Sequence, residues 1–201
     1  MKNNKIIINS DLPVVNVVMS GVGGQGVLVA SDVLVRVAML AGLDTKKSEV
    51  HGMAQRGGSV VSQIRYGEKI YSPLIEKGSA DIILAFEKLE AVRYLDFLKP
   101  NGIMIINSQQ ITPLSVFFFD IPYPEDVQVI CKKKTEQIVM IEGIKIAERL
   151  KNQRVLNTVM LGALSNFLQF DEEHWIKAIE QRVPPKTFDL NRKAFEAGKT
   201  A

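Results

Sequence analysis

Short apolar runs, separated by turn-forming residues, mark the chain up to residue 133. The first run, residues 14–19, is β-branched and leads into a glycine-rich turn. The apolar stretch that follows, from Val27 to Gly42, is too long for a strand and predicts a mostly buried helix. A strand, a tight turn and a buried helix in this order open an α/β unit. The other runs with strand character are residues 45–50, 59–67, 81–86, 102–109, 116–122 and 127–133.

Amphipathic spacing predicts helices between and after these strands. Residues 87–98 form one such helix, which stops at the Lys99–Gly102 turn, and a hairpin-type turn at Tyr66–Lys69 leads into residues 70–75. The later helices are residues 144–150, 157–168, 171–183 and 184–201. The pattern predicts an α/β fold with a Rossmann-like, mostly parallel sheet flanked by helices and a helical C-terminal third. No linker divides the chain, so residues 1–201 are expected to form a single domain.

Composition narrows the class of protein. A chain of 201 residues with 46% hydrophobic residues can form one domain with a sizeable core. The net charge of +3 is mild, and the basic cluster Lys132–Lys134 favours a solvated strand end, so no nucleic-acid partner is expected. The N-terminal residues lack a signal-peptide pattern, and no apolar run is long enough for a membrane span. We therefore expect a cytoplasmic protein with no membrane partner.

The single cysteine, Cys131, limits the redox chemistry that the chain can carry. It permits no disulfide within the chain, and alone it cannot hold a four-cysteine iron–sulfur cluster. Its apolar surroundings in the sequence favour a packed core thiol. His174 lies at a predicted helix start and is expected at the surface. No metal-ligand spacing occurs, so no metal site is predicted.

The glycine-rich turn is the first candidate site. It contains Gly21, Gly23, Gly24, Gln25 and Gly26 in a G-x-G-x-x-G pattern between the first strand and the first helix. Glycines let the backbone turn tightly and let a phosphate approach the amides at a helix N-terminus. The turn is compatible with a phosphate or acyl-carrier contact, with NAD or FAD, and with simple packing of helix on sheet. A dinucleotide site also needs an acid on the second strand, and neither Asp44 nor Glu49 ends an apolar strand cleanly.

The second candidate site is the segment HGMAQRGGS, residues 51–59. Core packing does not need its composition, which includes His51, Gln55, Arg56, Gly57, Gly58 and Ser59. Arginine is suited to a bidentate grip on phosphate or carboxylate, and the paired glycines allow close backbone approach. The alternative is a bulged turn with a solvated arginine. For His51, a role in the site and a hydrogen-bonded loop position are equally acceptable.

Polar residues also follow the predicted strands. Glu87, with Glu90 one helical turn later, comes directly after residues 81–86, where α/β sheets place ligand sites, although a helix cap or dipole role is the first interpretation. Asn107 and Ser108 end the next strand in the same way. Asn157 precedes a buried helix, and we interpret it first as a cap.

The two glycine-spaced segments together resemble a known family. SGVGGQGVLVASDVL followed by SEVHGMAQRGGSVVSQIRYG is similar to the gamma-type domain of 2-oxoacid:ferredoxin oxidoreductases, over roughly residues 14–190. HGMAQRGG, ADIILAFEKLEAVRYLDFLKPNG and NTVMLGALSNFL look like the small (beta) subunit of the indolepyruvate type. The pyruvate and 2-oxoglutarate relatives tend to have Tyr-Gly and an acid before Met-Arg-Gly-Gly. This chain has His51-Gly52 and Ala54-Gln55-Arg56 instead.

The resemblance implies a reaction and a division of labour. A 2-oxoacid, here an aryl pyruvate, would react with coenzyme A and oxidised ferredoxin to give an acyl-CoA, carbon dioxide and reduced ferredoxin. Thiamine diphosphate, Mg and 4Fe-4S clusters would lie on a large partner subunit and none on this chain alone. The sequence agrees by lacking a Gly-Asp-Gly motif with a downstream Asn-Asn pair. We therefore expect a subunit of a hetero-oligomer that is inactive by itself.

The roles expected for the two segments follow from chemistry and spacing. Both should lie at the carboxyl edge of the sheet and face the large subunit. Arg56 would hold a phosphate of coenzyme A or the substrate carboxylate, and the amides of Gly23 to Gly26 would add neutral donors. No residue is assigned a catalytic role. Three alternatives stand: a pyruvate, 2-oxoisovalerate or 2-oxoglutarate enzyme, a stand-alone NAD-binding Rossmann oxidoreductase, and an interaction module whose loops only pack against a partner.

Overall fold

A mixed, mostly parallel sheet forms the centre of the molecule. The computed structural model describes residues 14–51, 57–112 and 123–201. In these ranges the strands are β1 (Val14–Val22), β2 (Asp44–His51), β3 (Ser59–Gly67), β4 (Ala80–Ala85), β5 (Leu98–Asn107) and β6 (Ile138–Ile141). Their order across the sheet is β2-β3-β1-β4-β5-β6. β1, β4, β5 and β6 pair in parallel, whereas β3 is antiparallel to both β1 and β2 and so opposes all the others.

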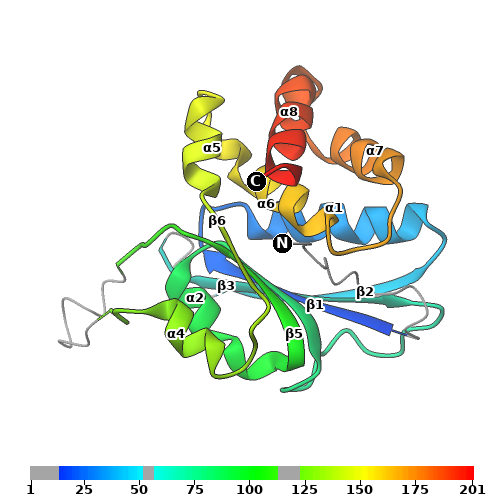
Figure 1. Cartoon of the computed structure of the whole chain (residues 1–201). Helices are drawn as coiled ribbons and strands as arrows, with labels where there is room; N and C mark the ends of the chain where they lie inside the picture. The colour runs from blue at the N-terminus through cyan, green and yellow to red at the C-terminus, as the bar shows by residue number, and fades with distance from the viewer. Residues whose placement is uncertain (1–13, 52–56, 113–122) are drawn as a thin grey trace, which may run out of the picture.

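Helices cover both faces of this sheet (Figure 1). One face carries α1 (Val27–Leu40), α5 (Gly143–Arg149), α6 (Leu156–Ser165), α7 (Glu172–Arg182) and α8 (Phe188–Lys199). The other carries α2 (Lys88–Arg93) and α4 (Val127–Lys132). Short 3-10 turns lie at Leu95–Phe97, Gln153–Val155 and Pro185–Thr187. The expected α/β fold with a helical C-terminal third is confirmed.

Each face of the sheet has its own apolar core, because neighbouring residues of a strand point to opposite sides. Val17 and Met19 of β1 belong to the core under α1 and α6, and Val18 belongs to the core over α2 and α4. The central strand β4 is buried along its whole length. A strand buried on both faces reads as a continuous apolar run, which explains why residues 81–86 predict a strand without alternation.

Two glycines let α6 and α8 pack backbone against backbone. A Cβ atom on Gly162 would lie 2.1 Å from the carbonyl oxygen of Phe195, and one on Gly198 would lie 1.9 Å from the carbonyl oxygen of Val159. Real Cβ atoms do not approach backbone oxygens so closely, so neither position has room for a side chain. This contact fixes α8 on α6, and α6 in turn packs on the sheet beside the glycine-rich turn.

Two sequence predictions near the far edge of the sheet were wrong. Residues 127–133 were predicted as a strand, but the structure forms α4 there, capped by the Asp126 side chain, which accepts from the Val129 amide at 3.0 Å. Val127 and Cys131 are buried and Val129 is 54% exposed, so the apolar period is four residues. The basic cluster Lys132–Lys134 therefore lies at the end of a helix and not of a strand. The short run at Ile138–Ile141, which the sequence analysis passed over, is β6.

Other boundaries also shifted. The turn at Tyr66–Lys69 does not lead into a strand at residues 70–75, because Arg65 holds this segment through the carbonyl oxygens of Ser72 and Leu74. The predicted helix 87–98 ends as α2 at Arg93. The predicted strand at 116–122 lies outside the described residues.

The glycine contact between α6 and α8 predicts a large loss of stability for Gly198→Ala. The added methyl would displace α8 from α6, and overpacking of this kind destabilises by about 1–3 kcal/mol or more. Thermal or urea unfolding measures the loss. Glu196→Ala, on the exposed side of the same helix, is the matched control and should change the free energy of unfolding by less than about 0.5 kcal/mol. Equal stability of Gly198→Ala and wild type would contradict the close packing.

Candidate functional site

The two glycine-spaced segments meet at the carboxyl edge of the sheet. β1 ends at Val22 and runs into the glycine turn, while the segment after β2 returns at Gly57 and enters β3 at Ser59. Val22 and Ser59 are cross-strand partners. The Gly23 amide donates to the Gly58 carbonyl oxygen at 2.9 Å. The antiparallel course of β3 therefore places the end of one segment directly against the start of the other.

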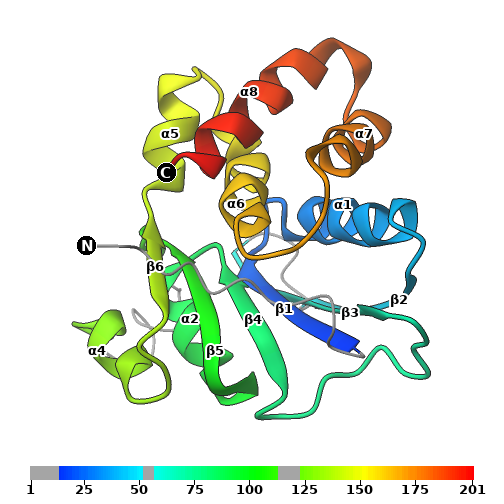
Figure 2. The same ribbon diagram turned by 45° about the vertical axis from the view of Figure 1, so that its right-hand side comes forward.

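The glycine turn also lies at a topological switch point of the sheet. α1 follows β1 onto one face, and α2 follows the neighbouring strand β4 onto the opposite face (Figure 2). Two chain connections that leave a sheet in opposite directions open a crevice outside the carboxyl ends of the strands, where α/β proteins place ligands. The candidate site thus occupies the position that general topology favours.

The glycines of the turn serve different purposes. Gly24 and Gly26 have positive φ angles of 104° and 82°, a conformation that disfavours other residues. A Cβ atom on Gly24 would have none of the described residues within 4 Å, so on this side Gly24 borders open space in that part of the chain. A Cβ atom on Gly21 would lie within 2.9 Å of Gln25 and Phe86, so Gly21 is a packing position.

Only part of the expected set of backbone donors is free for a ligand. The Gly23 amide is used by Gly58, and the Gln25 amide donates to the Val22 carbonyl oxygen at 3.1 Å. The expectation that all four amides from Gly23 to Gly26 serve a ligand is therefore wrong for two of them. The amides of Gly24 and Gly26 remain, next to the first turn of α1, which has no side-chain cap. Uncapped amides at a helix N-terminus favour an anion.

Asn157 is the residue of this site that sequence reasoning missed. It lies in the first turn of α6 and not at its cap, so the capping interpretation was wrong. Its side chain is 6% exposed and lies against the turn, because a Cβ atom on Gly26 would be 3.1 Å from Asn157 Nδ2. Asn157 Oδ1 accepts from the amide of Thr158 at 2.9 Å. Within the described part of the chain Nδ2 has no acceptor, and it is not among the fully enclosed polar atoms, which leaves a donor beside the turn.

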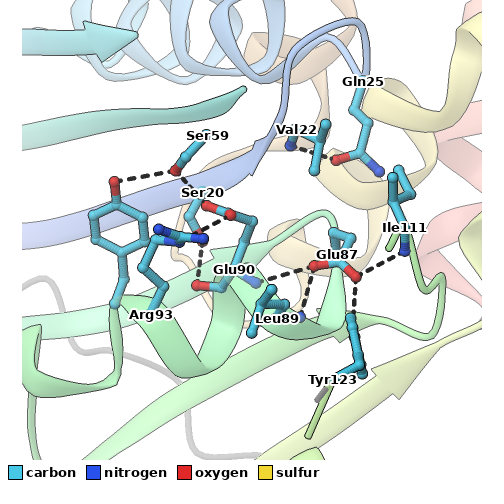
Figure 3. A network of polar contacts seen from close by, with 11 residues as sticks. Ser20, Val22, Gln25, Ser59, Glu87, Leu89, Glu90, Arg93, Ile111 and Tyr123 are labelled. Atoms are coloured by element: carbon cyan, nitrogen blue, oxygen red, sulfur yellow. Dashed lines mark hydrogen bonds and ion pairs between the residues drawn. The ribbon is translucent and has the colours of Figure 1, made fainter. Parts of the chain in front are cut away.

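Ser59 faces away from the turn, toward α2 (Figure 3). Its hydroxyl donates to Glu90 Oε2 at 2.5 Å and lies 3.4 Å from the Tyr94 hydroxyl. Glu90 is 3% exposed and also accepts from Arg93 Nε at 3.1 Å. Burial raises the pKa of the Glu90 carboxyl, and the bonds from Ser59 and Arg93 act against this rise. The Ser59 hydroxyl thus anchors the start of β3, and its donor is already used.

Glu87 caps α2, as the sequence suggested, and also binds two neighbouring segments by hydrogen bonds (Figure 3). Glu87 is 1% exposed, and its carboxylate accepts four hydrogen bonds. Two come from the amides of Leu89 at 2.6 Å and Glu90 at 3.1 Å, and the others from the Ile111 amide at 3.0 Å and the Tyr123 hydroxyl at 2.6 Å. Burial and the Glu87 carboxylate raise the pKa of Tyr123. Glu87 is a satisfied structural carboxylate.

The acids considered for a dinucleotide site are occupied elsewhere. Glu49 of β2 pairs with Lys47 at 2.5 Å, and Lys47 also pairs with Asp32 of α1. Asp32 in turn pairs with Arg182 of α7 at 2.8 Å. Asp44 lies at the start of β2, at the opposite edge of the sheet from the glycine turn. β3 separates β2 from β1, so Glu49 is two strands away from the turn that would hold the dinucleotide.

The remaining predicted residues divide into three groups. Gln55 and Arg56 lie outside the described residues, as does the side chain of His51, so their roles stay predictions. Cys131 is buried as expected, and burial raises the pKa of its thiol to about 11. His174, expected at the surface, is half-buried with Nδ1 enclosed.

Neither a metal cluster nor a membrane-spanning helix occurs in the described residues. No group of three or more His, Cys, Asp or Glu residues in them could hold a metal ion. None of the helices in these ranges is long and apolar enough to cross a membrane.

Comparison with known proteins places the chain in a family. Residues 16–201 match the family model for pyruvate ferredoxin/flavodoxin oxidoreductase. The indolepyruvate oxidoreductase subunit IorB of Thermococcus kodakarensis is 39% identical over 188 residues, which are 91% of this chain and 93% of that protein.

Two solved structures share the fold. The gamma subunit of a keto/oxoacid ferredoxin oxidoreductase from Geobacter sulfurreducens aligns with a TM-score of 0.67 and 24% identity, over 92% of this chain and 95% of that one. A 2-oxoglutarate:ferredoxin oxidoreductase from Magnetococcus marinus aligns with a TM-score of 0.72 and 21% identity, over 94% of this chain and 31% of that one. The resemblance inferred from the two glycine segments is confirmed, and the chain belongs to the pyruvate ferredoxin/flavodoxin oxidoreductase family.

Proposed function

We propose that this chain is the small, non-thiamine subunit of an indolepyruvate-type 2-oxoacid:ferredoxin oxidoreductase. In this proposal the glycine turn and Asn157 bind coenzyme A where the chain meets a large subunit. The observation that carries the proposal is Asn157 Nδ2, which has no acceptor in the described residues and lies beside Gly26 and the open backbone of Gly24. The 39% identity to an indolepyruvate oxidoreductase subunit supports the substrate class.

The donor set suits a phosphate-bearing ligand. Gly24 allows close approach of the ligand to the backbone, because no atom of the described residues lies within 4 Å of the place of its missing Cβ atom. The two glycine amides and the start of α1, a helix of 14 residues, favour negative charge. The buried carboxylates Glu87 and Glu90 are held by donors of their own, which include Arg93 for Glu90. The solved Magnetococcus marinus relative contains coenzyme A and succinyl-CoA, which is consistent with this ligand class.

A nicotinamide cofactor fits the same turn less well. A Rossmann site holds the ribose with an acid at the end of the strand beside β1. In this chain that neighbour is β3, which runs in the opposite direction and contributes Ser59 in place of an acid. Glu49 lies on β2, two strands away from β1, and is paired there with Lys47. These observations favour the coenzyme A proposal over a stand-alone NAD-dependent enzyme.

The chemistry of oxidation is assigned to the partner. Thiamine diphosphate with Mg, held by a large subunit, supplies decarboxylation, and 4Fe-4S clusters on that subunit pass electrons to ferredoxin. The lone thiol of Cys131 is enclosed in the core and suits neither role. This chain, located in the cytoplasm, would bind coenzyme A and hold its thiol toward the partner. Because the solved Magnetococcus marinus chain is about three times as long as the part aligned here, a fused or separate larger partner is consistent with the family.

Asn157→Leu tests the proposed site directly. Leucine has a similar volume but cannot donate, and a hydrogen bond to a charged group contributes about 1.5–3 kcal/mol. We expect the KM for coenzyme A to rise about tenfold or more in the assembled enzyme, with the KM for the 2-oxoacid unchanged. Asn166→Leu, at the other end of α6, is the matched control and should leave both constants unchanged. A wild-type KM for coenzyme A in Asn157→Leu would count against the proposal.

Arg56→Ala tests the second segment. If Arg56 grips a phosphate or carboxylate, its loss should raise the KM for coenzyme A or for the 2-oxoacid by about tenfold or more. Arg36→Ala, on the exposed side of α1, removes the same charge elsewhere and should have no such effect. Steady-state kinetics of the complex measures both. Normal assembly with both constants at wild-type values would exclude Arg56 as a ligand contact.

A further inference from the structure

The side chain of Gln25 is fully used inside the protein. Its Oε1 accepts from the Val22 amide at 2.7 Å, and its Nε2 donates to the Phe86 carbonyl oxygen at 2.9 Å and to Gln109 Oε1 at 2.9 Å. A primary amide nitrogen carries two hydrogens, and both have partners. Gln25 was predicted to contact a cofactor, yet it has no donor left for one.

The partners of Gln25 are themselves held in place. The Phe86 carbonyl oxygen also accepts from Asn107 Nδ2 at 2.9 Å, and Asn107 Oδ1 accepts from the Gly143 amide at 3.0 Å. The Gln109 carbonyl oxygen accepts from the Lys88 amide at 3.1 Å. A row of amide groups therefore joins the carboxyl ends of β1, β4 and β5 to the first residue of α5.

Gln25 is the side chain that crosses the topological switch point within this row. The connection from β1 to α1 leaves toward one face, and the connection from β4 to α2 leaves toward the other (Figure 2). The Phe86 amide donates to the Ser20 carbonyl oxygen at 2.8 Å, so the backbones of β1 and β4 are joined up to this point. Beyond it, the glycine turn needs a further link to the residues that follow β4 and β5. The bonds from Gln25 to Phe86 and Gln109 supply that link, and Figure 3 shows Gln25 reaching over from the glycine turn.

We propose that Gln25 is a positioning residue for the coenzyme A site: it locks the glycine turn to the ends of β4 and β5 so that the Gly24 and Gly26 amides and Asn157 keep their mutual geometry. This inference rests on the proposed function. It replaces the direct ligand contact that the sequence suggested. Gly24 and Gly26 have positive φ angles, and Gly24 has no close neighbour among the described residues, so the link through Gln25 between them helps to determine where their amides point.

The role requires an amide and not a carboxylate at position 25. Gln25→Glu keeps the size of the side chain but replaces the donating nitrogen with an oxygen. That oxygen would face two acceptors, the Phe86 carbonyl oxygen and Gln109 Oε1. Two acceptor oxygens with no hydrogen between them repel each other, so both hydrogen bonds would be lost. Gln109→Ala removes one of the two acceptors and leaves the glycine turn chemically intact, so it tests the same link from the other side.

The experiment compares these variants in the complex assembled with the large subunit. We expect Gln25→Glu to raise the KM for coenzyme A at least tenfold, with the KM for the 2-oxoacid and the kcat at saturating coenzyme A close to wild type. Gln109→Ala should raise the same KM by a smaller factor. The double variant should be no worse than Gln25→Glu, because both changes break one link.

Gln137→Glu is the matched control. Gln137 Nε2 donates to the Asn101 carbonyl oxygen at 2.8 Å, at the opposite edge of the sheet. The control makes the same chemical change and should leave the KM for coenzyme A unchanged, whatever its effect on the melting temperature. If the Gln25→Glu variant does not assemble with the large subunit, the Gln109→Ala variant tests the positioning role instead, because it should still raise the KM for coenzyme A.

Other outcomes separate the positioning role from the proposed function. A lower melting temperature with an unchanged KM for coenzyme A in Gln25→Glu and Gln109→Ala would overturn the positioning role. An effect of Gln25→Glu with none of Gln109→Ala, or additive effects in the double variant, would show direct ligand contact and also overturn it. If Asn157→Leu is equally without effect, the coenzyme A site itself lies elsewhere. If Asn157→Leu does raise this KM, only the positioning role fails.

Discussion

The antiparallel strand β3, inserted beside β1, is the constraint on which the site depends. Because β3 begins where β1 ends, the segment that precedes it must return to the glycine turn, and the bond from Gly23 to Gly58 closes the junction. In an all-parallel Rossmann sheet the neighbour of β1 would present its own carboxyl end, and with it an acid for a ribose. The inserted strand removes that acid and supplies a second glycine-rich segment. The reversed direction of β3 thus leaves a dinucleotide-like glycine turn without the acid that a dinucleotide needs, which favours a different ligand.

Most polar groups at this edge are arranged by buried hydrogen bonds, with one ion pair between Glu90 and Arg93. Glu87 is satisfied by three amides and a hydroxyl, and Gln25 by one donor and two acceptors. Groups buried in this way are costly to rearrange, because each unmade bond leaves a desolvated partner. The edge is therefore rigid where it is described. Asn157, whose Nδ2 has no acceptor in the described ranges, stands apart from this arrangement.

Much of this fold could be predicted from the sequence because local patterns and tertiary structure agree. The continuous apolar run of β4 and the long apolar stretch of α1 are buried as their patterns indicate. The strand predicted at residues 127–133 was wrong because a short apolar run fits both a strand and a helix. The cap formed by Asp126 favours the helix. β6 is only four residues long and gives little signal.

The candidate site could be located from the sequence but not resolved into roles. Glycine spacing places the turn correctly, since φ angles above zero need glycine. Spacing does not show that Gln25 bonds inward to Phe86, 61 residues away, or that Asn157 lies against Gly26. Both facts depend on tertiary contacts between distant segments. The inward direction of Ser59 likewise depends on Glu90, which belongs to a different layer of the fold.

Amide hydrogen exchange in the assembled complex, with and without coenzyme A, tests the central claim most directly. The account predicts that coenzyme A slows exchange at the amides of Gly24, Gly26 and the first turn of α1, while the amides of Gly23 and Gln25, already bonded within the protein, change little. Unchanged exchange across the glycine turn, with protection confined to other parts of this chain or to the large subunit, would contradict it.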